Sequence, residues 1–301
     1  MNKQPNFLIF GAPKCGTTAL SEYLRSNPSV YMSSPKELHY FCDDLQIPGR
    51  IETRDHYLRC FADTGERQIA IGEASPLYLL SETAARNAHA HVPDARIIVM
   101  LRSTPEYLYS YYSHLLYLGD ENLPDFEAAW QAQADRQSGR VSYPRGCREP
   151  KRLDYVWAGR LGMHVERLLK YFPRSQVKFV FLEELQNDPR QTYVEILQFI
   201  CAKDDGKSSF PAINQNKRHK LRWLGGLPHL VPKPLLAGVS TVKKHLGLNG
   251  YSLTRSLMAM NTETSKVGSL SAPMRKTLIE VFRDDIRLLS ALTGHSLDHW
   301  L

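Results

Sequence analysis

The stretch from Phe7 to Leu24, FLIFGAPKCGTTALSEYL, constrains the fold more than any other part of the chain. It joins a short apolar run to a loop with two glycines, Gly11 and Gly16, and then to an amphipathic segment. This order is typical of a β-strand, a turn and an α-helix. Such a loop directs unpaired backbone N–H groups and the positive end of a helix dipole at a bound anion. The segment therefore predicts a phosphate-binding loop that follows a strand.

Apolar strands and amphipathic helices alternate along most of the chain. Further strands are predicted at 68–73, 95–102 and 177–185, and helices at 81–91, 105–118, 126–137, 161–171, 189–201 and 272–292. Strands without a polar face are buried on both sides, so the alternation predicts an α/β fold with a parallel sheet between two layers of helices, a three-layer arrangement. Ligands of such sheets bind where the strands end. We therefore expect the site among residues 14–18, 73–76 and 102–110.

The bulk composition indicates one folded, soluble chain. The 301 residues, 43% hydrophobic and 23% charged, exclude a disordered or fibrous protein and predict a single domain over 1–301. Residues 214–270 are basic and irregular, and we expect them to form a lid or an acceptor-side region of that domain. The net charge of +7 favours an anionic ligand or acceptor, although it also serves solubility.

Several function classes find no support in the sequence. The five cysteines show no C-x-x-C spacing, which predicts neither a disulfide framework nor a zinc site. No apolar run is long enough for a secretory signal or a transmembrane helix, so we expect a cytoplasmic protein. The basic run from Lys217 to Arg222 could bind nucleic acid, but no motif that reads nucleic acid accompanies it, and none is expected as a partner. The oligomeric state is not indicated.

The loop after the first strand departs from that of nucleoside triphosphatases. Their pattern G-x-x-x-x-G-K-S/T places a lysine directly after the second glycine, and an acidic residue at a neighbouring strand end helps to hold magnesium. Here Thr17 follows Gly16, the lysine is Lys14, and the strand at 95–102 ends in Arg102. Both departures favour an anionic nucleotide held by cations and amides without a catalytic metal. A glycine-containing turn that binds nothing is the alternative.

Several separate stretches carry a resemblance to a known family. FLIFGAPKCGTTAL and RIIVMLRSTPEYLYSYYSH occur in order with SPKELHYF, GEASPLYL, YFPRSQVKFVFLEELQNDP and FRDDIRLLSALTGHSLDHW. Together they resemble the sulfotransferases that use 3′-phosphoadenosine 5′-phosphosulfate (PAPS), most closely the branch that sulfates glycans of the heparan type and its bacterial relatives. The resemblance covers most of the chain and weakens between 214 and 265. It implies the P-loop NTPase-like sulfotransferase fold.

The resemblance also implies how the donor is held. Lys14 would reach the bridging oxygen of the sulfate and steady the leaving phosphate. The 5′-phosphosulfate would be bound by Pro13, Lys14, Cys15, Gly16, Thr17 and Thr18, with no catalytic role for the thiol of Cys15. Arg102 and Ser110 would bind the 3′-phosphate, for which the planar fork of an arginine is suited. Lys217 and Arg218 could close over the same phosphate, although a solvated charge run is as good an interpretation.

The base that accepts the acceptor's proton is expected on the acceptor side of the same site. Glu73 ends a predicted strand and should point into the cleft, and the resemblance implies that it is the catalytic base. The alternative is that Glu73 only caps the next helix. His39 is the rival base, although a lone histidine is more often structural. Lys36, Glu37 and His39 are expected to line the substrate site. Ala74 stands where the glycan enzymes usually have lysine, which puts the acceptor type in doubt.

These expectations combine into one function and two alternatives. The chain is expected to transfer a sulfuryl group from PAPS to an acceptor hydroxyl on a carbohydrate, another small molecule or a lipid-linked alcohol, leaving 3′-phosphoadenosine 5′-phosphate (PAP). The transfer would be a metal-independent in-line displacement. A P-loop kinase or hydrolase is one alternative, and a nucleotide-binding module whose chemistry has decayed is the other.

Overall fold

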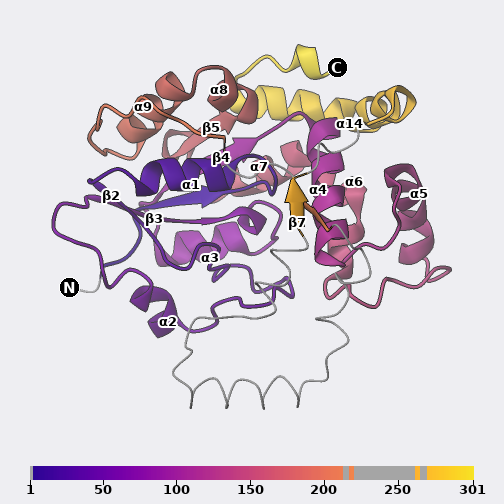
Figure 1. Ribbon diagram of the computed structural model, residues 1–301, viewed down its shortest axis with the longest axis horizontal. Coiled ribbons are helices and arrows are strands. Elements are labelled where there is room, and N and C mark those ends of the chain that lie inside the picture. The colour runs from indigo at the N-terminus through magenta and orange to yellow at the C-terminus, as the bar shows by residue number, and fades with distance from the viewer. Residues whose placement is uncertain (1–2, 213–216, 220–261, 265–269) are drawn as a thin grey trace. The chain divides into compact units, whose positions relative to one another are not determined.

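A computed structural model describes residues 3–212, 217–219, 262–264 and 270–301, and Figure 1 shows their arrangement. The strands are β1 (Phe7–Phe10), β2 (Val30–Met32), β3 (Ala70–Ser75), β4 (Arg96–Leu101), β5 (Val177–Phe181), β6 (Lys217–His219) and β7 (Thr262–Thr264). The α-helices are α1 (Thr17–Arg25), α2 (Arg54–Arg59), α3 (Ala84–His91), α4 (Thr104–Leu118), α5 (Phe126–Gln137), α6 (Tyr155–Gly159), α7 (Leu161–Leu169), α8 (Leu182–Asn187), α9 (Pro189–Phe199) and α14 (Ala272–Thr293). Short 3₁₀ helices are η1 (Pro76–Tyr78), η2 (Pro150–Leu153), η3 (Arg174–Gln176) and η4 (Asp298–Trp300).

The chain divides into two compact units. The first comprises residues 1–111, 154–214 and 270–301, and the second comprises residues 112–153 and 215–269. The first unit contains a five-stranded parallel sheet in the order β2-β3-β1-β4-β5. The connection through α1, after β1, and the connection through α3, after β3, run in opposite directions across the sheet. Because parallel crossovers are right-handed, the two helices lie on opposite faces of the sheet. Figure 1 shows them on either side of the strands. The predicted α/β fold is confirmed.

The central strands are buried along their whole length. All four residues of β1 have no exposed surface, and β4 is buried from Ile97 to Leu101. Fully burying one such side chain contributes about 1.5–3 kcal/mol. This burial explains why these strands carry no polar face. It also leaves their carboxyl ends, where polar residues first appear, as the edge of the sheet that can meet a ligand.

Several parts of the first unit differ from the sequence prediction. The strand expected at 68–73 is β3, which runs from Ala70 to Ser75. The strand expected at 177–185 ends at Phe181, and Leu182–Asn187 forms α8. The side chain of Glu184 accepts a hydrogen bond from the backbone N–H of Phe181 at 3.1 Å, which caps the new helix and ends the strand. The sequence also gave no signal for β2, which is only three residues long, or for α2.

The second unit contains α5, η2 and the end of α4, and the short antiparallel pair of β6 and β7. A buried ion pair between Arg136 and Glu121, with N–O distances of 2.7 and 2.8 Å, joins α5 to the residues that follow α4. The basic region expected at 214–270 lies almost wholly outside the described residues. Within the described ranges, no helix combines the length and apolar character that crossing a bilayer requires.

Candidate active site

The loop after β1 is held against the ends of the two neighbouring strands. The N–H of Ala12 donates to the carbonyl of Met100 at the end of β4, at 2.7 Å. Gly11 lies so close to the residue that follows β3 that a Cβ atom there would be 2.0 Å from the carbonyl oxygen of Pro76. Only glycine allows this approach. The loop therefore has a fixed position at the carboxyl edge of the sheet, held against the ends of β3 and β4.

The same loop ends in an uncapped helix N-terminus. Gly16, at φ +90°, precedes α1, and no side chain caps the helix. The first backbone bond of the helix runs from Leu20 N–H to Gly16 O, and no acceptor in the described part of the chain binds the N–H groups of Thr17 or Thr18. Unpaired amides and the helix dipole together attract an anion. The structure thus supplies the donors that the sequence predicted here.

The side chains of the loop differ in what they can reach. Lys14 is partly exposed and has φ +65°, a left-handed conformation that is costly for a residue with a Cβ. Pro13 and Cys15 are buried, and burial raises the pKa of the Cys15 thiol to about 12 although nearby Arg102 opposes the shift. At neutral pH this thiol is protonated and is no nucleophile. Backbone groups and Lys14, then, are what the loop offers a ligand.

Arg102 and Ser110 occupy the neighbouring strand end and helix. Arg102 directly follows β4, is partly exposed, and forms no hydrogen bond or ion pair with the described residues. Ser110 lies on α4, two turns further on, and is 4% exposed. The N–H of Ser103 donates to Glu183 Oε1 at 3.4 Å, so the ends of β4 and β5 meet here. An unpaired guanidinium beside the amide-rich loop makes this edge of the sheet suited to a second anionic group.

Glu73 is placed differently from the expectation that it opens into a cleft. Its side chain on β3 has no exposed surface. Its Oε1 accepts hydrogen bonds from the hydroxyls of Tyr78 at 2.7 Å and Tyr57 at 3.0 Å, and its Oε2 accepts one from Ser75 at 2.7 Å. Burial raises the pKa of Glu73, and the hydrogen bonds from the three hydroxyls oppose that shift. The carboxylate is therefore enclosed by the protein and already binds three hydroxyl groups.

Lys36, Glu37 and His39 lie together on the loop that follows β2. Lys36 Nζ is 2.6 Å from Glu37 Oε1, and His39 Nε2 is 3.6 Å from Glu37 Oε2. Burial alone would raise the pKa of Glu37, but the His39 ring and the Lys36 ammonium lower it to about 2. The Glu37 side chain is 42% exposed, whereas that of His39 is 7% exposed. Of the carboxylates predicted for the site, Glu37 is the one that solvent reaches.

The chain resembles known proteins over most of its length. Residues 4–216 match the family described as the sulfotransferase domain. The chain belongs to this family. It is similar in structure to a sulfotransferase from Alicyclobacillus acidocaldarius, with a TM-score of 0.70, 25% sequence identity and 99% of each chain covered.

Among relatives, human heparan sulfate glucosamine 3-O-sulfotransferase 6 is 29% identical over 83% of this chain and 72% of its own. Human bifunctional heparan sulfate N-deacetylase/N-sulfotransferase 2 is 28% identical over 66% of this chain. The match covers only 22% of that longer protein.

The sulfotransferase domain brings most of the expected residues to one edge of its sheet. The loop of Lys14 contacts Pro76 after β3, and the N–H of His39 donates to Ser75 Oγ at 3.0 Å, which ties the loop after β2 to the same strand end. Lys217 and Arg218 belong to β6, and their side chains lie outside the described part of the chain. Their contact with a nucleotide stays a prediction.

The sequence did not point to the three hydroxyls that surround Glu73. Ser75 and Tyr78 stand in the stretch EASPLY, so their closeness to Glu73 in the chain could have drawn attention to them. Tyr57 belongs to α2, sixteen residues before Glu73, in a stretch without strand or motif signals. Only the folded chain of this sulfotransferase brings it to the carboxylate.

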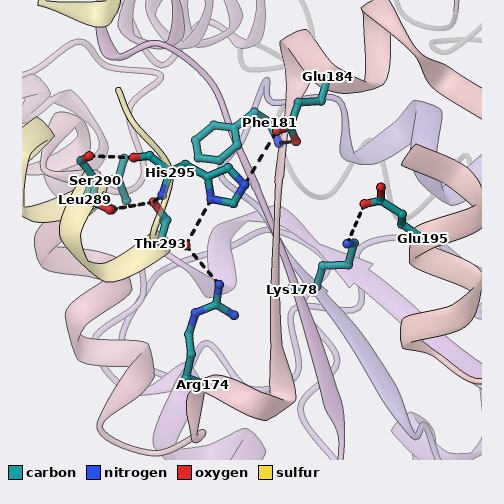
Figure 2. Close-up of polar contacts among 9 residues, drawn as sticks. All are labelled: Arg174, Lys178, Phe181, Glu184, Glu195, Leu289, Ser290, Thr293 and His295. Atoms are coloured by element: carbon teal, nitrogen blue, oxygen red, sulfur yellow. Dashed lines mark hydrogen bonds and ion pairs between the residues drawn. The ribbon is translucent and has the colours of Figure 1, made fainter. Parts of the chain in front are cut away.

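A cavity of about 700 Å³ lies elsewhere in the domain, along the outer edge of β5 and beside α9. Figure 2 shows two pairs of ionisable side chains in its lining: Lys178 with Glu195 at 3.1 Å, and His295 with Glu184 at 3.8 Å. Arg174 donates to the carbonyl of Thr293 at 3.1 Å. None of the residues expected in the sulfotransferase site lines this cavity. This cavity therefore does not coincide with the candidate site at the loop after β1.

Proposed function

We propose that this protein transfers a sulfuryl group from PAPS to a hydroxyl of a carbohydrate-type acceptor. The observation that carries the proposal is a pair of separate anion positions at one edge of the sheet. One is the loop of Lys14 with the unpaired amides of Thr17 and Thr18, and the other is the guanidinium of Arg102. PAPS carries a 5′-phosphosulfate and a separate 3′-phosphate, which matches two positions rather than one.

The arrangement favours PAPS over a nucleoside triphosphate with magnesium. Phosphoryl transfer needs a metal because the transferred group carries much negative charge. A sulfuryl group carries less, so a lysine and a helix N-terminus can stabilise the charge that develops on the leaving phosphate. Arg102, at the end of β4, would repel the cation that a triphosphatase binds. The proposed mechanism is therefore a metal-independent in-line displacement in which Lys14 stabilises the leaving group.

The acceptor class rests on the relatives. Both human relatives cited above are named as heparan sulfate sulfotransferases, and one of them is named a glucosamine 3-O-sulfotransferase. We extend to this chain only the class, a hydroxyl on a carbohydrate or a similar alcohol. Ala74, in place of the lysine usual in the glycan branch, is one position at which this chain could differ in its choice of acceptor.

We propose Glu37, in place of Glu73, as the general base. A base must come within hydrogen-bond reach of the acceptor hydroxyl, and Glu73 is fully buried with its two oxygens bound by three hydroxyls. Glu37 is 42% exposed and is ionised at neutral pH because its pKa is lowered to about 2. His39 is the remaining candidate, but its ring is 7% exposed.

A carboxylate with so low a pKa is a weak base until its partners change. Lys36 contributes to that low pKa through its contact with Glu37 at 2.6 Å. An anionic sulfate bound beside Lys36 would compete for the ammonium group. The pKa of Glu37 would then rise, and with it the ability of the carboxylate to take the proton of the acceptor. Donor binding would in this way prepare the base for the step that follows.

The test begins with nucleotide binding and continues to transfer. PAP should raise the melting temperature by mass action, whereas ATP with magnesium should have little effect. Labelled PAPS should transfer its sulfate to at least one member of a panel of glycans, phenols and lipid-linked alcohols. Preference for ATP with magnesium would favour a kinase or hydrolase, and binding of PAP without transfer or hydrolysis of PAPS would favour a decayed module.

The base is identified by substitution. Glu37→Gln should lower kcat by at least about 100-fold, the contribution of a general base, while the affinity for PAP changes little. His39→Ala serves as the comparison, since its ring could act instead. A full loss of turnover with His39→Ala, together with a mild effect of Glu37→Gln, would reverse the two roles.

A further inference from the structure

We propose that Glu73 is a positioning residue for transfer: its buried carboxylate fixes the loop from Lys36 to Phe41 through two hydroxyl groups. The inference rests on the proposed function, because it concerns the loop that carries Glu37. Each hydroxyl forms two hydrogen bonds, one to the carboxylate and one to a backbone N–H of the loop. We call these two chains of hydrogen bonds, through Ser75 and through Tyr78, the relays.

The first relay passes through Ser75. Its hydroxyl donates to Glu73 Oε2 at 2.7 Å and accepts the N–H of His39 at 3.0 Å. A backbone N–H can only donate, so the serine oxygen must accept, and the hydroxyl proton is left for the carboxylate. Glu73 in its ionised form can only accept, which fixes the direction of both bonds. The charge of Glu73 thereby sets the position of the His39 amide.

The second relay passes through Tyr78 in η1. Its hydroxyl donates to Glu73 Oε1 at 2.7 Å and accepts the N–H of Phe41 at 3.4 Å. The two relays therefore hold the backbone N–H groups of His39 and Phe41, which are two positions apart in the loop. All the groups involved are buried: Glu73 and Ser75 are 0% exposed, Tyr78 is 1% exposed and Phe41 is 2% exposed. Water cannot replace a hydroxyl that is lost here, so a broken relay leaves a donor without a partner.

The loop needs such anchors because of its backbone conformation. Glu37 has φ +66° and His39 has φ +51°, the left-handed region that residues with a Cβ seldom adopt. Such conformations persist only where the surroundings enforce them. Two carbonyl groups of the loop are held as well, since Leu38 O accepts from Ile51 and His39 O accepts from Cys42, both at 3.0 Å. The relays are the corresponding contacts for the N–H groups.

Tyr57 provides a matched control for Tyr78. Both tyrosines donate to Glu73 Oε1, at 3.0 and 2.7 Å, and both are almost fully buried. Only Tyr78 also accepts an N–H of the loop. Tyr57→Phe and Tyr78→Phe therefore remove the same atom and the same bond to the carboxylate, but only the second cuts a relay. Ser75→Ala cuts the other relay.

The first measurement is hydrogen exchange of individual amides by NMR, which does not depend on activity. Tyr78→Phe should speed exchange of the Phe41 amide by about tenfold or more, and Ser75→Ala that of the His39 amide, since each loses its buried acceptor. Tyr57→Phe should leave both within about threefold of the wild type. Amides of β5 report any general loss of stability. Equal effects of the two tyrosine variants on Phe41 would overturn the proposal.

The second measurement is steady-state transfer from PAPS. Ser75→Ala and Tyr78→Phe should each lower kcat by about tenfold or more with the Kd for PAP unchanged, since a displacement near 1 Å costs about that much or more. Should Glu73 instead be the base, removing the Ser75 hydroxyl would free one oxygen and raise its basicity. Activity maintained or increased in Ser75→Ala would thus contradict positioning. Should wild-type protein transfer no sulfate, the proposed function fails, and the exchange result still decides whether the relays fix the loop.

Discussion

Replacement of Arg102 by alanine tests whether the end of β4 holds a second phosphate of the donor. Arg102 has no hydrogen bond or ion pair with the described residues. Removing its side chain therefore breaks no bond to another described residue. We expect the free energy of unfolding to change by no more than about 0.5 kcal/mol. Any large effect should appear in ligand binding alone.

The expected loss of affinity follows from the position of the side chain. Truncating one member of a buried, hydrogen-bonded charge pair costs about 2–5 kcal/mol. Arg102 is partly exposed, so solvent screens part of its interaction with a phosphate. We therefore expect the lower part of this range, about 2–3 kcal/mol, which corresponds to a Kd for PAP that rises about 30- to 160-fold.

Calorimetry with two ligands tells which phosphate is involved. PAP and adenosine 5′-monophosphate differ only in the 3′-phosphate. If Arg102 binds that group, Arg102→Ala should raise the Kd for PAP by the factor given above and the Kd for the monophosphate by less than about threefold. Arg102→Lys should recover only part of the affinity, because an ammonium group lacks the planar fork that binds phosphate at two points.

Arg96→Ala is the matched control. Arg96 begins β4 and so lies about 20 Å from Arg102 along the same strand. Both variants change the net charge equally, so a general electrostatic effect would appear in both. An equal loss for the two ligands in Arg102→Ala would place Arg102 at the 5′-phosphate, and no loss would refute the assignment of this strand end to the donor.

Three further predictions concern the loop, the metal and the acceptor side. Gly11→Ala would place a Cβ 2.0 Å from Pro76 O, so it should cost about 1–3 kcal/mol of stability in urea unfolding and weaken PAP binding at least about tenfold. Gly65→Ala is the control: its Cβ would lie 3.7 Å from the nearest atom, and neither stability nor PAP binding should change. Addition of EDTA should leave the rate of sulfate transfer within about twofold of the rate without EDTA, whereas a magnesium-dependent transfer would stop. The pKa of Glu37 is lowered from 4.5 to about 2 in the folded chain, so between these values the unfolded chain binds more protons and stability must fall as the pH falls. Glu37→Gln should reduce this dependence, measured as the change in urea midpoint between pH 6 and pH 3, and an unchanged dependence would contradict the pairing with Lys36.

The sequence predicted the parts of the site that depend on local order along the chain. The apolar run before Gly11 and the amphipathic segment after Gly16 gave β1, the loop and α1, because strand and helix periodicities are local properties. The parallel sheet then followed from the alternation of elements, and with it the position of the loop beside the end of β4. Rules that act within a few residues, or on the order of elements, were sufficient for this half of the site.

The acceptor half could not be predicted in the same way. Glu73 was expected at the end of its strand, but β3 continues to Ser75. Whether the carboxylate faces a cleft or the interior depends on Tyr57, which comes from a separate helix. Strand alternation gives the side to which a residue points and not what covers that side. The misread end of β5 has a similar origin, since the helix that follows the strand is capped by a hydrogen bond that the Glu184 side chain accepts from the backbone N–H of Phe181.

The distribution of charge explains why Lys14, within the loop, can replace the lysine that nucleoside triphosphatases carry directly after the second glycine. Several carboxylates at the carboxyl edge of the sheet are bound by groups of the chain itself: Glu73 by three hydroxyls, Glu106 by Ser103 and Arg275, and Glu37 by Lys36. Hydrogen bonds stabilise the charge of Glu73, and cationic side chains compensate the charges of Glu106 and Glu37. The backbone N–H groups of Thr17 and Thr18 and the guanidinium of Arg102 have no such partners among the described residues. A ligand that enters this edge thus meets a field that favours anions at two points, and a donor with two anionic groups gains from both without a metal ion.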